Sequence, residues 1–297
     1  MSYRRHLAFA LLCAALPLSA ADKKKDPNEI GDRNVAGKLN VYSLEKEMAL
    51  GRQLDIEVRK QARIVDDPIV SEYINRLGQN LARNSDVTFP VSFTLIEADD
   101  INAFTLPGGF IFVNTATLRL SDNEAELASV MAHELGHAAA RHATRQATRN
   151  ELVSAGTLPL FLLGPWTGLL AHSAASLATP MFLFHFSREF ETEADLLGIQ
   201  YLWKAGYDPS ASVDMFERVE STERRKPGSV SKLFLTHPLT ADRIEKTQKN
   251  IDELLPGRAE YIINSSEYEA VRDRLAELSQ QHKPESKERE HPTLRRN

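Results

Sequence analysis

The segment Met131-Ala132-His133-Glu134-Leu135-Gly136-His137 has the spacing of a metal site on a helix. Residues four apart on a helix share one face, so His133 and His137 can direct imidazole nitrogens at one metal ion. Glu134 lies one step round the helix, where it can deprotonate a water activated by that metal. Two neutral imidazoles beside an open position suit Zn²⁺, so the pattern predicts a hydrolytic zinc site.

The residues around this motif predict the helix that it needs. Ser121 to Glu124 matches an S-x-x-E capping box, and helical sequence continues from there to about Arg149. Without that context, the same motif would also fit a surface helix carrying two unrelated histidines. His142 lies five residues beyond His137 and is rotated off the ligand face, so we interpret it as packing or as support for a ligand.

A zinc hydrolase needs a third protein ligand, and the acidic residues after Ser187 are the candidates. Glu191 and Asp195 lie four apart on a second predicted helix. One carboxylate can bind zinc while the other accepts the remaining N–H of a ligand histidine. Glu189 and Glu193 fit a solvated helix face, and spacing alone does not choose among the three glutamates.

Together these motifs resemble the HtpX and CaaX-prenyl-protease family of zinc metallopeptidases, which are gluzincins. The resemblance rests on His133-Glu134-x-x-His137 followed by E-x-x-A-D from Glu191 to Asp195. Two further motifs agree and stand in the family's order: N-A-F-x-L-P-G-G over residues 102–109 and H-P-x-x-x-x-R over residues 237–243. The similarity spans roughly residues 43–278 and is strongest to the periplasmic BepA- and LoiP-like branch, without the tetratricopeptide repeats found in some members.

The resemblance implies a role for each motif residue. Glu191 would be the third ligand of one zinc ion per chain, with Asp195 orienting a ligand histidine. Glu134 would be the general base. His237 would lie over the zinc, either stabilising the oxyanion of the tetrahedral intermediate or capping the metal in a resting state. Arg243 would orient His237 or hold a nearby carboxylate.

A small sheet is predicted ahead of the metal helix. Residues 87–97 are rich in β-forming residues, and two short strands flank a Pro-Gly-Gly turn at residues 107–109. A plain hairpin is one interpretation. The interpretation favoured by the resemblance makes the strand after Gly109 an exposed edge that pairs with an extended peptide, with Gly108, Gly109 and Phe110 contacting substrate.

The N-terminal and C-terminal segments are predicted to lie outside the folded domain. Residues 1–21 are typical of a cleaved secretory signal peptide, with Arg4 and Arg5 before a short apolar run and small residues after it. Cys13, the only cysteine, lies within that run, so the mature chain needs no disulfide. These features predict a periplasmic protein. Residues 22–42 read as a flexible leader and residues 281–297 as a disordered tail.

Residues 152–187 form a segment of 36 residues without Asp, Glu, Lys or Arg. Three prolines and three glycines interrupt it, so no clean membrane-spanning helix is predicted. Buried helices with a flap beside the active site, a membrane-surface or re-entrant element, and a transmembrane hairpin all remain open. The formal net charge of −5 gives no basic field for nucleic acid.

The sequence therefore predicts a mainly helical α+β fold with a small sheet and one zinc metallopeptidase domain over residues 43–280. The expected function is endoproteolysis of unfolded or misfolded envelope proteins, a quality-control role that the resemblance implies. Two alternatives are a chaperone-like binder with a closed zinc site and a membrane-embedded protease. Oligomeric state and cleavage preference are not predicted. Further helices are predicted over residues 44–63, 68–82, 209–223 and 265–279.

Overall fold

The computed structural model describes residues 23–37, 39–154, 186–225, 237–238 and 240–281. The predictions for the signal peptide, for residues 155–185 and for residues 282–297 lie outside these ranges. Within them, no helix is both long and apolar enough to cross a bilayer.

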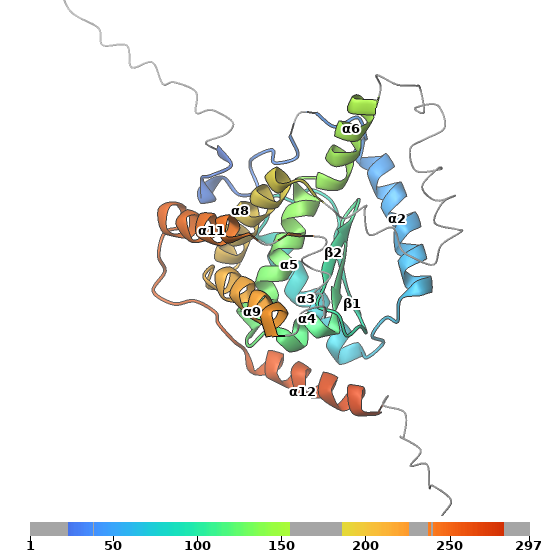
Figure 1. The fold of residues 1–297 in the computed structure, drawn as a ribbon, viewed down its shortest axis with the longest axis vertical. Helices are drawn as coiled ribbons and strands as arrows, with labels where there is room; N and C mark the ends of the chain where they lie inside the picture. The colour runs from blue at the N-terminus through green and yellow to red at the C-terminus, as the bar shows by residue number, and fades with distance from the viewer. Residues whose placement is uncertain (1–22, 38, 155–185, 226–236, 239, 282–297) are drawn as a thin grey trace, which may run out of the picture.

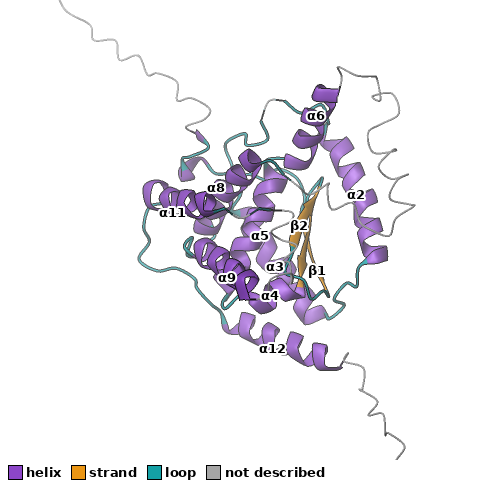
Figure 2. Cartoon of the chain, in the orientation of Figure 1, coloured by secondary structure: helices purple, strands orange, loops and turns teal. Residues whose placement is uncertain are grey.

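Helices dominate the described residues, as predicted, and a small sheet lies among them (Figure 2). The predicted helices and the hairpin are confirmed, with ends within a few residues of those expected except at the end of the motif helix. The helical elements are η1 (Pro27–Glu29), α2 (Leu44–Gln61), α3 (Pro68–Arg83), α4 (Thr115–Leu120), α5 (Glu124–Ala139), α6 (His142–Ser154), α8 (Arg188–Lys204), α9 (Ala211–Arg225), α11 (Ala241–Leu254) and α12 (Ser266–Gln281).

The sheet contains three strands in the order β1-β3-β2: β1 (Ser92–Ile96), β3 (Phe110–Asn114) and β2 (Ala103–Leu106). β3 runs parallel to β1 and antiparallel to β2, its hairpin partner. β3 is therefore the central strand, and the prediction that the strand after Gly109 is an exposed edge is wrong. The reason is its composition, because Ile111, Phe112 and Val113 are fully buried and need cover on both faces of the sheet.

Helices cover both faces of this sheet (Figure 1). On one face, Leu50, Leu54 and Val58 of α2 pack against the strands. On the other face, α3 and α5 supply the main core of the protein. α5 in turn lies between the sheet and α8, so the motif helix occupies the centre of the fold.

The ends of α5 differ from the prediction in two ways. Ser121 does not cap it but donates to Thr117 O at the end of α4, and Asn123 is the N-cap, accepting from Glu126 N at 3.0 Å. The helix also stops at Ala139 rather than continuing to Arg149, because Arg141 has a φ of 54°, in the left-handed region. α6 starts at the next residue and runs in a new direction.

The N-terminal segment, residues 23–37, is packed against the domain, so the prediction of a flexible leader is wrong for these residues. Arg33 forms a buried ion pair with Asp86, in which the two side chains are 1% and 0% exposed. Ile30 and Val35 join the main core. A buried carboxylate needs a paired cation, so Asp86 requires Arg33 and thereby fixes this segment.

Candidate active site

Two glycines bring α5 and α8 close together. A Cβ at position 136 would lie 2.9 Å from the backbone oxygen of Ala194, and a Cβ at position 198 would lie 3.1 Å from the Cα of His133. Only hydrogen atoms fit at these positions, so the two backbones cross almost in contact. This crossing places Glu191 and Asp195 on α8 directly opposite the two histidines of α5.

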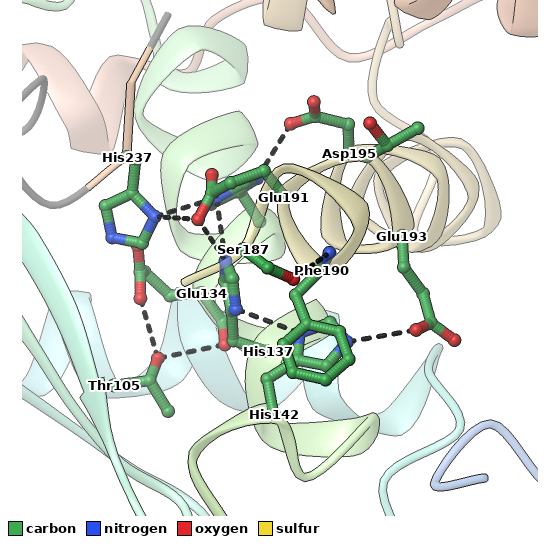
Figure 3. A network of polar contacts seen from close by, with 12 residues as sticks. Thr105, Glu134, His137, His142, Ser187, Phe190, Glu191, Glu193, Asp195 and His237 are labelled. Atoms are coloured by element: carbon green, nitrogen blue, oxygen red, sulfur yellow. Dashed lines mark hydrogen bonds and ion pairs between the residues drawn. The ribbon is translucent and has the colours of Figure 1, made fainter. Parts of the chain in front are cut away.

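Four side chains converge at the crossing, and Figure 3 shows three of them, His137, Glu191 and His237. They are His133, His137, Glu191 and His237, whose donor atoms all lie within 4.8 Å of one another. His137 Nε2 lies 3.1 Å from His133 Nε2, and His237 Nδ1 lies 3.0 Å from Glu191 Oε1. Three imidazole nitrogens and one carboxylate facing a common point fit a divalent transition metal ion.

Asp195 and Arg243 hold one side of this cluster. His133 Nδ1 lies 3.0 Å from Asp195 Oδ1, so the carboxylate orients the ring whose Nε2 faces the cluster. Arg243 donates to both oxygens of Asp195 at 2.8 Å and also to the backbone oxygens of His237 and Pro238. One guanidinium therefore contacts both α8 and the His237 loop. Arg243 is thus placed both to orient His237 and to hold the Asp195 carboxylate.

In the absence of metal, the pKa values of the two histidines of α5 are shifted in opposite directions. Burial lowers the pKa of His133, but hydrogen bonds and charge from Asp195 and Glu191 outweigh it and raise this pKa to about 10. Burial holds the pKa of His137 well below its ordinary value, and the neighbouring imidazoles add to the effect. A metal ion bound here would therefore displace a proton chiefly from His133.

Glu134 is fully buried and fixed from the sheet. Thr105 Oγ1 on β2 donates to Glu134 Oε2 at 2.7 Å and lies 2.9 Å from the Glu134 backbone oxygen. The other carboxylate oxygen, Oε1, lies 3.4 Å from His237 Nε2. The role of Thr105 is not apparent from the sequence, although the residue lies within the N-A-F-x-L-P-G-G motif.

His142 and Glu193 support the cluster from its other side. His142 Nδ1 lies 2.9 Å from His137 Nδ1, and His142 Nε2 lies 3.2 Å from Glu193 Oε2. His142 thus contacts a candidate ligand, as its interpretation as a supporting residue requires. The prediction that Glu193 is solvated is wrong, because its side chain is only 15% exposed. Glu189, by contrast, is exposed and pairs with Arg149 at the surface.

The glycines predicted to contact substrate are buried against the protein's own chain. A Cβ at Gly108 would lie 2.7 Å from the Cα of Met48, and one at Gly109 would lie 2.9 Å from the backbone oxygen of Pro90. Both have positive φ values, 75° and 90°, which the tight β2–β3 turn requires. Phe110 opens the central strand. These residues therefore form the turn, and their contact with substrate stays a prediction.

A cavity of about 40 Å³ lies beside the cluster. His133, Glu134 and His237 form its polar end. The rest of its wall is mostly apolar and comes from α5, α8 and α9, including Val130, Ile199, Met215, Phe216 and Val219. This volume is enough for a few water molecules beside the candidate general base.

Comparison with known proteins agrees with the motifs. Residues 68–251 match the model of Peptidase family M48. The chain is 33% identical over 237 residues to the beta-barrel assembly-enhancing protease of Escherichia coli (strain K12), covering 77% of this chain and 47% of that protein. It is 34% identical over 254 residues to the putative beta-barrel assembly-enhancing protease of Vibrio cholerae serotype O1, covering 82% and 52%.

A eukaryotic protein shows the same similarity over a shorter span. The mitochondrial metalloendopeptidase OMA1 of Schizosaccharomyces pombe is 35% identical over 155 residues, which is 52% of this chain and 44% of that protein. The chain spans about half the length of the curated relatives it matches. The family match covers most of the domain and includes every residue of the buried cluster, so the chain belongs to peptidase family M48.

Proposed function

We propose that this chain is a zinc-dependent endopeptidase that acts on unfolded or misfolded proteins of the bacterial cell envelope. The observation that carries the proposal is the buried cluster of His133, His137, Glu191 and His237, with the fixed carboxylate of Glu134 beside it. Membership of a peptidase family supports the same reaction class.

Zinc is the metal that the donor set favours. Imidazole nitrogens with a single carboxylate are typical zinc ligands, and the described part of the chain brings no thiolate to the cluster. His133, His137 and Glu191 would hold one ion per chain, because these three come from two rigid helices. When bound, zinc would supply Lewis-acid chemistry that polarises the scissile carbonyl and acidifies a water molecule.

The remaining chemistry belongs to the side chains around the cluster. Glu134 would take a proton from the attacking water and return it to the leaving amine. Thr105 would hold the Glu134 carboxylate in place through its 2.7 Å hydrogen bond. Asp195 would keep His133 oriented, because its own position is fixed by Arg243.

His237 has two conceivable positions in a working enzyme. Its Nδ1 lies among the other donor atoms, 3.4 Å from His133 Nε2, so in this structure it occupies a fourth ligand position. For substrate to reach the metal, the ring would move outward, where its Nε2–H can stabilise the oxyanion of the tetrahedral intermediate. His237 is carried by residues 237–238 and not by α5 or α8, so the proposed movement would break the contacts of Arg243 with this loop but displace neither helix.

The proposed location rests on the sequence and on relatives. Residues 1–21 have the pattern of a cleaved signal peptide, and two relatives are named for enhancing β-barrel assembly. A periplasmic quality-control protease would meet unfolded chains there. The apolar segment at residues 152–187 adds a proposed contact with the membrane surface.

The test is cleavage of casein by the purified mature protein, by Glu134→Gln and by Glu189→Gln, with zinc measured in each. Glu134→Gln should keep about one zinc per chain and lose activity by a factor on the order of a thousand or more, because the general base is gone. Glu189→Gln is the matched control, since this exposed glutamate should leave both properties unchanged. Equal activity of Glu134→Gln and wild type would refute the assignment.

A closed-site binder is the second candidate, and the position of His237 favours it. In that case the wild type would hold zinc and bind unfolded casein without cleaving it. His237→Ala would then open the fourth position and switch on cleavage. If His237→Ala is instead less active than an active wild type, the oxyanion role is supported and the closed-site candidate is rejected.

A further inference from the structure

The contact between His137 and His142 depends on the break between α5 and α6. In a continuous helix, a residue five positions beyond His137 would point away from it. The left-handed Arg141 reverses the chain locally, and its side chain is held by Glu47 Oε2 at 2.6 Å and by Tyr42 O at 2.7 Å. These contacts fix the turn that brings the two Nδ1 atoms to 2.9 Å.

The distance between the two rings determines where their protons lie. Only one proton can occupy the line between two nitrogens at 2.9 Å. Because His137 Nε2 faces the cluster and must offer a lone pair to a metal, His137 carries its proton on Nδ1 and donates it to His142 Nδ1. His142 then carries its own proton on Nε2 and donates it to Glu193 Oε2 at 3.2 Å. The chain of donors runs in one direction, from ligand to carboxylate.

Aromatic rings hold both imidazoles in this alignment. Phe190 stacks on His142 with a centroid distance of 4.4 Å, and Phe186 stacks on His137 at 4.2 Å. His142 has no exposed surface, so water has no access to replace it as the acceptor for His137. The arrangement gives His137 a single partner for its outer nitrogen.

The charge on Glu193 is compensated from two directions. Arg145 Nη1 lies 3.0 Å from Glu193 Oε2, and Lys24 Nζ lies 2.5 Å from Glu193 Oε1. Lys24 belongs to the N-terminal segment, which the buried Arg33–Asp86 pair fastens to the domain. The first residues after the predicted signal peptide therefore reach the metal cluster through three successive polar contacts.

We propose that His142 is a positioning residue for the metal ligand His137, and that Glu193, backed by Lys24 of the N-terminal segment, fixes His142 for this task. The inference rests on the proposed metal site. Asp195 contacts His133 directly, whereas Glu193 reaches His137 through an intervening imidazole. The two candidate metal ligands on α5 are therefore oriented by different arrangements of side chains. Outer-shell partners of this kind commonly contribute about 10- to 100-fold to metal affinity.

The test measures zinc affinity by competition with a chromophoric chelator and the visible absorption spectrum of the Co²⁺-substituted protein. His142→Phe keeps the stacked ring but removes the acceptor, so its zinc dissociation constant should rise about 10- to 100-fold and its cobalt bands should shift. His142→Asn restores an acceptor near the Nδ1 position and should recover most of the affinity. Glu193→Gln and Lys24→Met should show smaller losses in that order, and Glu189→Gln should show none.

Two reference samples separate the possible failures. His137→Ala should lose zinc, and if wild type also binds none, the proposed metal site fails rather than this inference. If wild type binds zinc and His142→Phe matches it in affinity and cobalt spectrum, His142 does not position His137. If His142→Asn binds zinc no more tightly than His142→Phe, and both metal-free variants melt at the same temperature as metal-free wild type, the hydrogen-bond explanation is overturned. Should His142→Phe fail to fold, Glu193→Gln against Glu189→Gln decides the question.

Discussion

Replacing Gly136 by alanine tests whether the close crossing of α5 and α8 sets the geometry of the metal site. The added Cβ would lie 2.9 Å from Ala194 O, 3.3 Å from Ala194 Cα and 3.4 Å from Leu197 Cβ. The nearest of these is a backbone atom inside a helix, so it cannot swing aside as a side chain does. The two helices must separate by roughly half an ångström to restore ordinary van der Waals distances.

The expected cost to stability is small, and the expected cost to metal binding is large. Alanine gains about 1 kcal/mol over glycine in a helix interior, whereas overpacking a core costs about 1–3 kcal/mol. The free energy of unfolding should therefore fall by about 0–2 kcal/mol. Glu191 lies within one turn of Ala194, and a metal site tolerates ligand shifts of only about 0.2 Å, so zinc affinity should fall on the order of tenfold or more.

Chelator competition measures the zinc affinity, and thermal unfolding with excess chelator measures the stability of the metal-free fold. Gly198→Ala should show a milder loss, because its Cβ would approach no atom closer than 3.1 Å. Gly257→Ala is the control, since a Cβ there meets nothing within 4 Å. If Gly136→Ala binds zinc as tightly as wild type and melts at a higher temperature, the close approach does not position Glu191.

Three further predictions concern the groups around the cluster. Arg243→Met leaves the buried Asp195 carboxylate without its cation, so urea unfolding should show a loss of about 3–5 kcal/mol, and a loss under 1 kcal/mol would contradict the argument. Thr105→Val frees the Glu134 carboxylate, so kcat on casein should fall about tenfold with zinc content unchanged, whereas unaltered kcat would show that Thr105 does not hold the base. The raised pKa of His133, about 10, means that the metal-free protein is protonated there at pH 7 and that zinc must displace this proton. Zinc affinity should therefore rise with pH until about pH 10, with close to one proton released per zinc at pH 7. Calorimetry in buffers of different ionisation enthalpy measures the proton release, and heats that do not depend on the buffer would refute it.

The sequence predicted the parts of the site that depend on helical spacing. His133 and His137 share a face of α5 because four residues make one turn, and Glu191 and Asp195 do so on α8. Ser43 and Asp67 cap the helices that follow them, each accepting from the backbone N–H three residues later. Ser121 had a competing partner, the end of α4, and the predicted cap was therefore two residues early.

What the sequence did not predict depends on contacts between distant segments. The helix break at Arg141 is stabilised by Glu47 and Tyr42, about a hundred residues earlier, and nothing local to Arg141 signals it. The role of Glu193 depends on that break, because a continuous helix would carry His142 away from it. The N-terminal segment looked flexible because its polar composition gave no sign that Arg33 would meet a buried carboxylate.

The central position of β3 in the sheet could not be predicted from local sequence. A hairpin of two strands can add a third strand on either side, and local sequence does not say which. The apolar run at residues 110–113 was the available signal, since a strand covered on both faces reads as continuous hydrophobic sequence. The family resemblance and the turn glycines favoured an exposed edge instead, but these glycines serve the chain's own tight turn.

The burial of α5 limits how an ion held at the proposed metal site could exchange. Every residue of this helix except His133 is buried, so its backbone amides are expected to exchange with solvent at a rate close to that of global unfolding. Among the four side chains of the cluster, His133 is the most exposed, at 12%. An ion bound there is therefore expected to exchange past His133 rather than through fraying of α5.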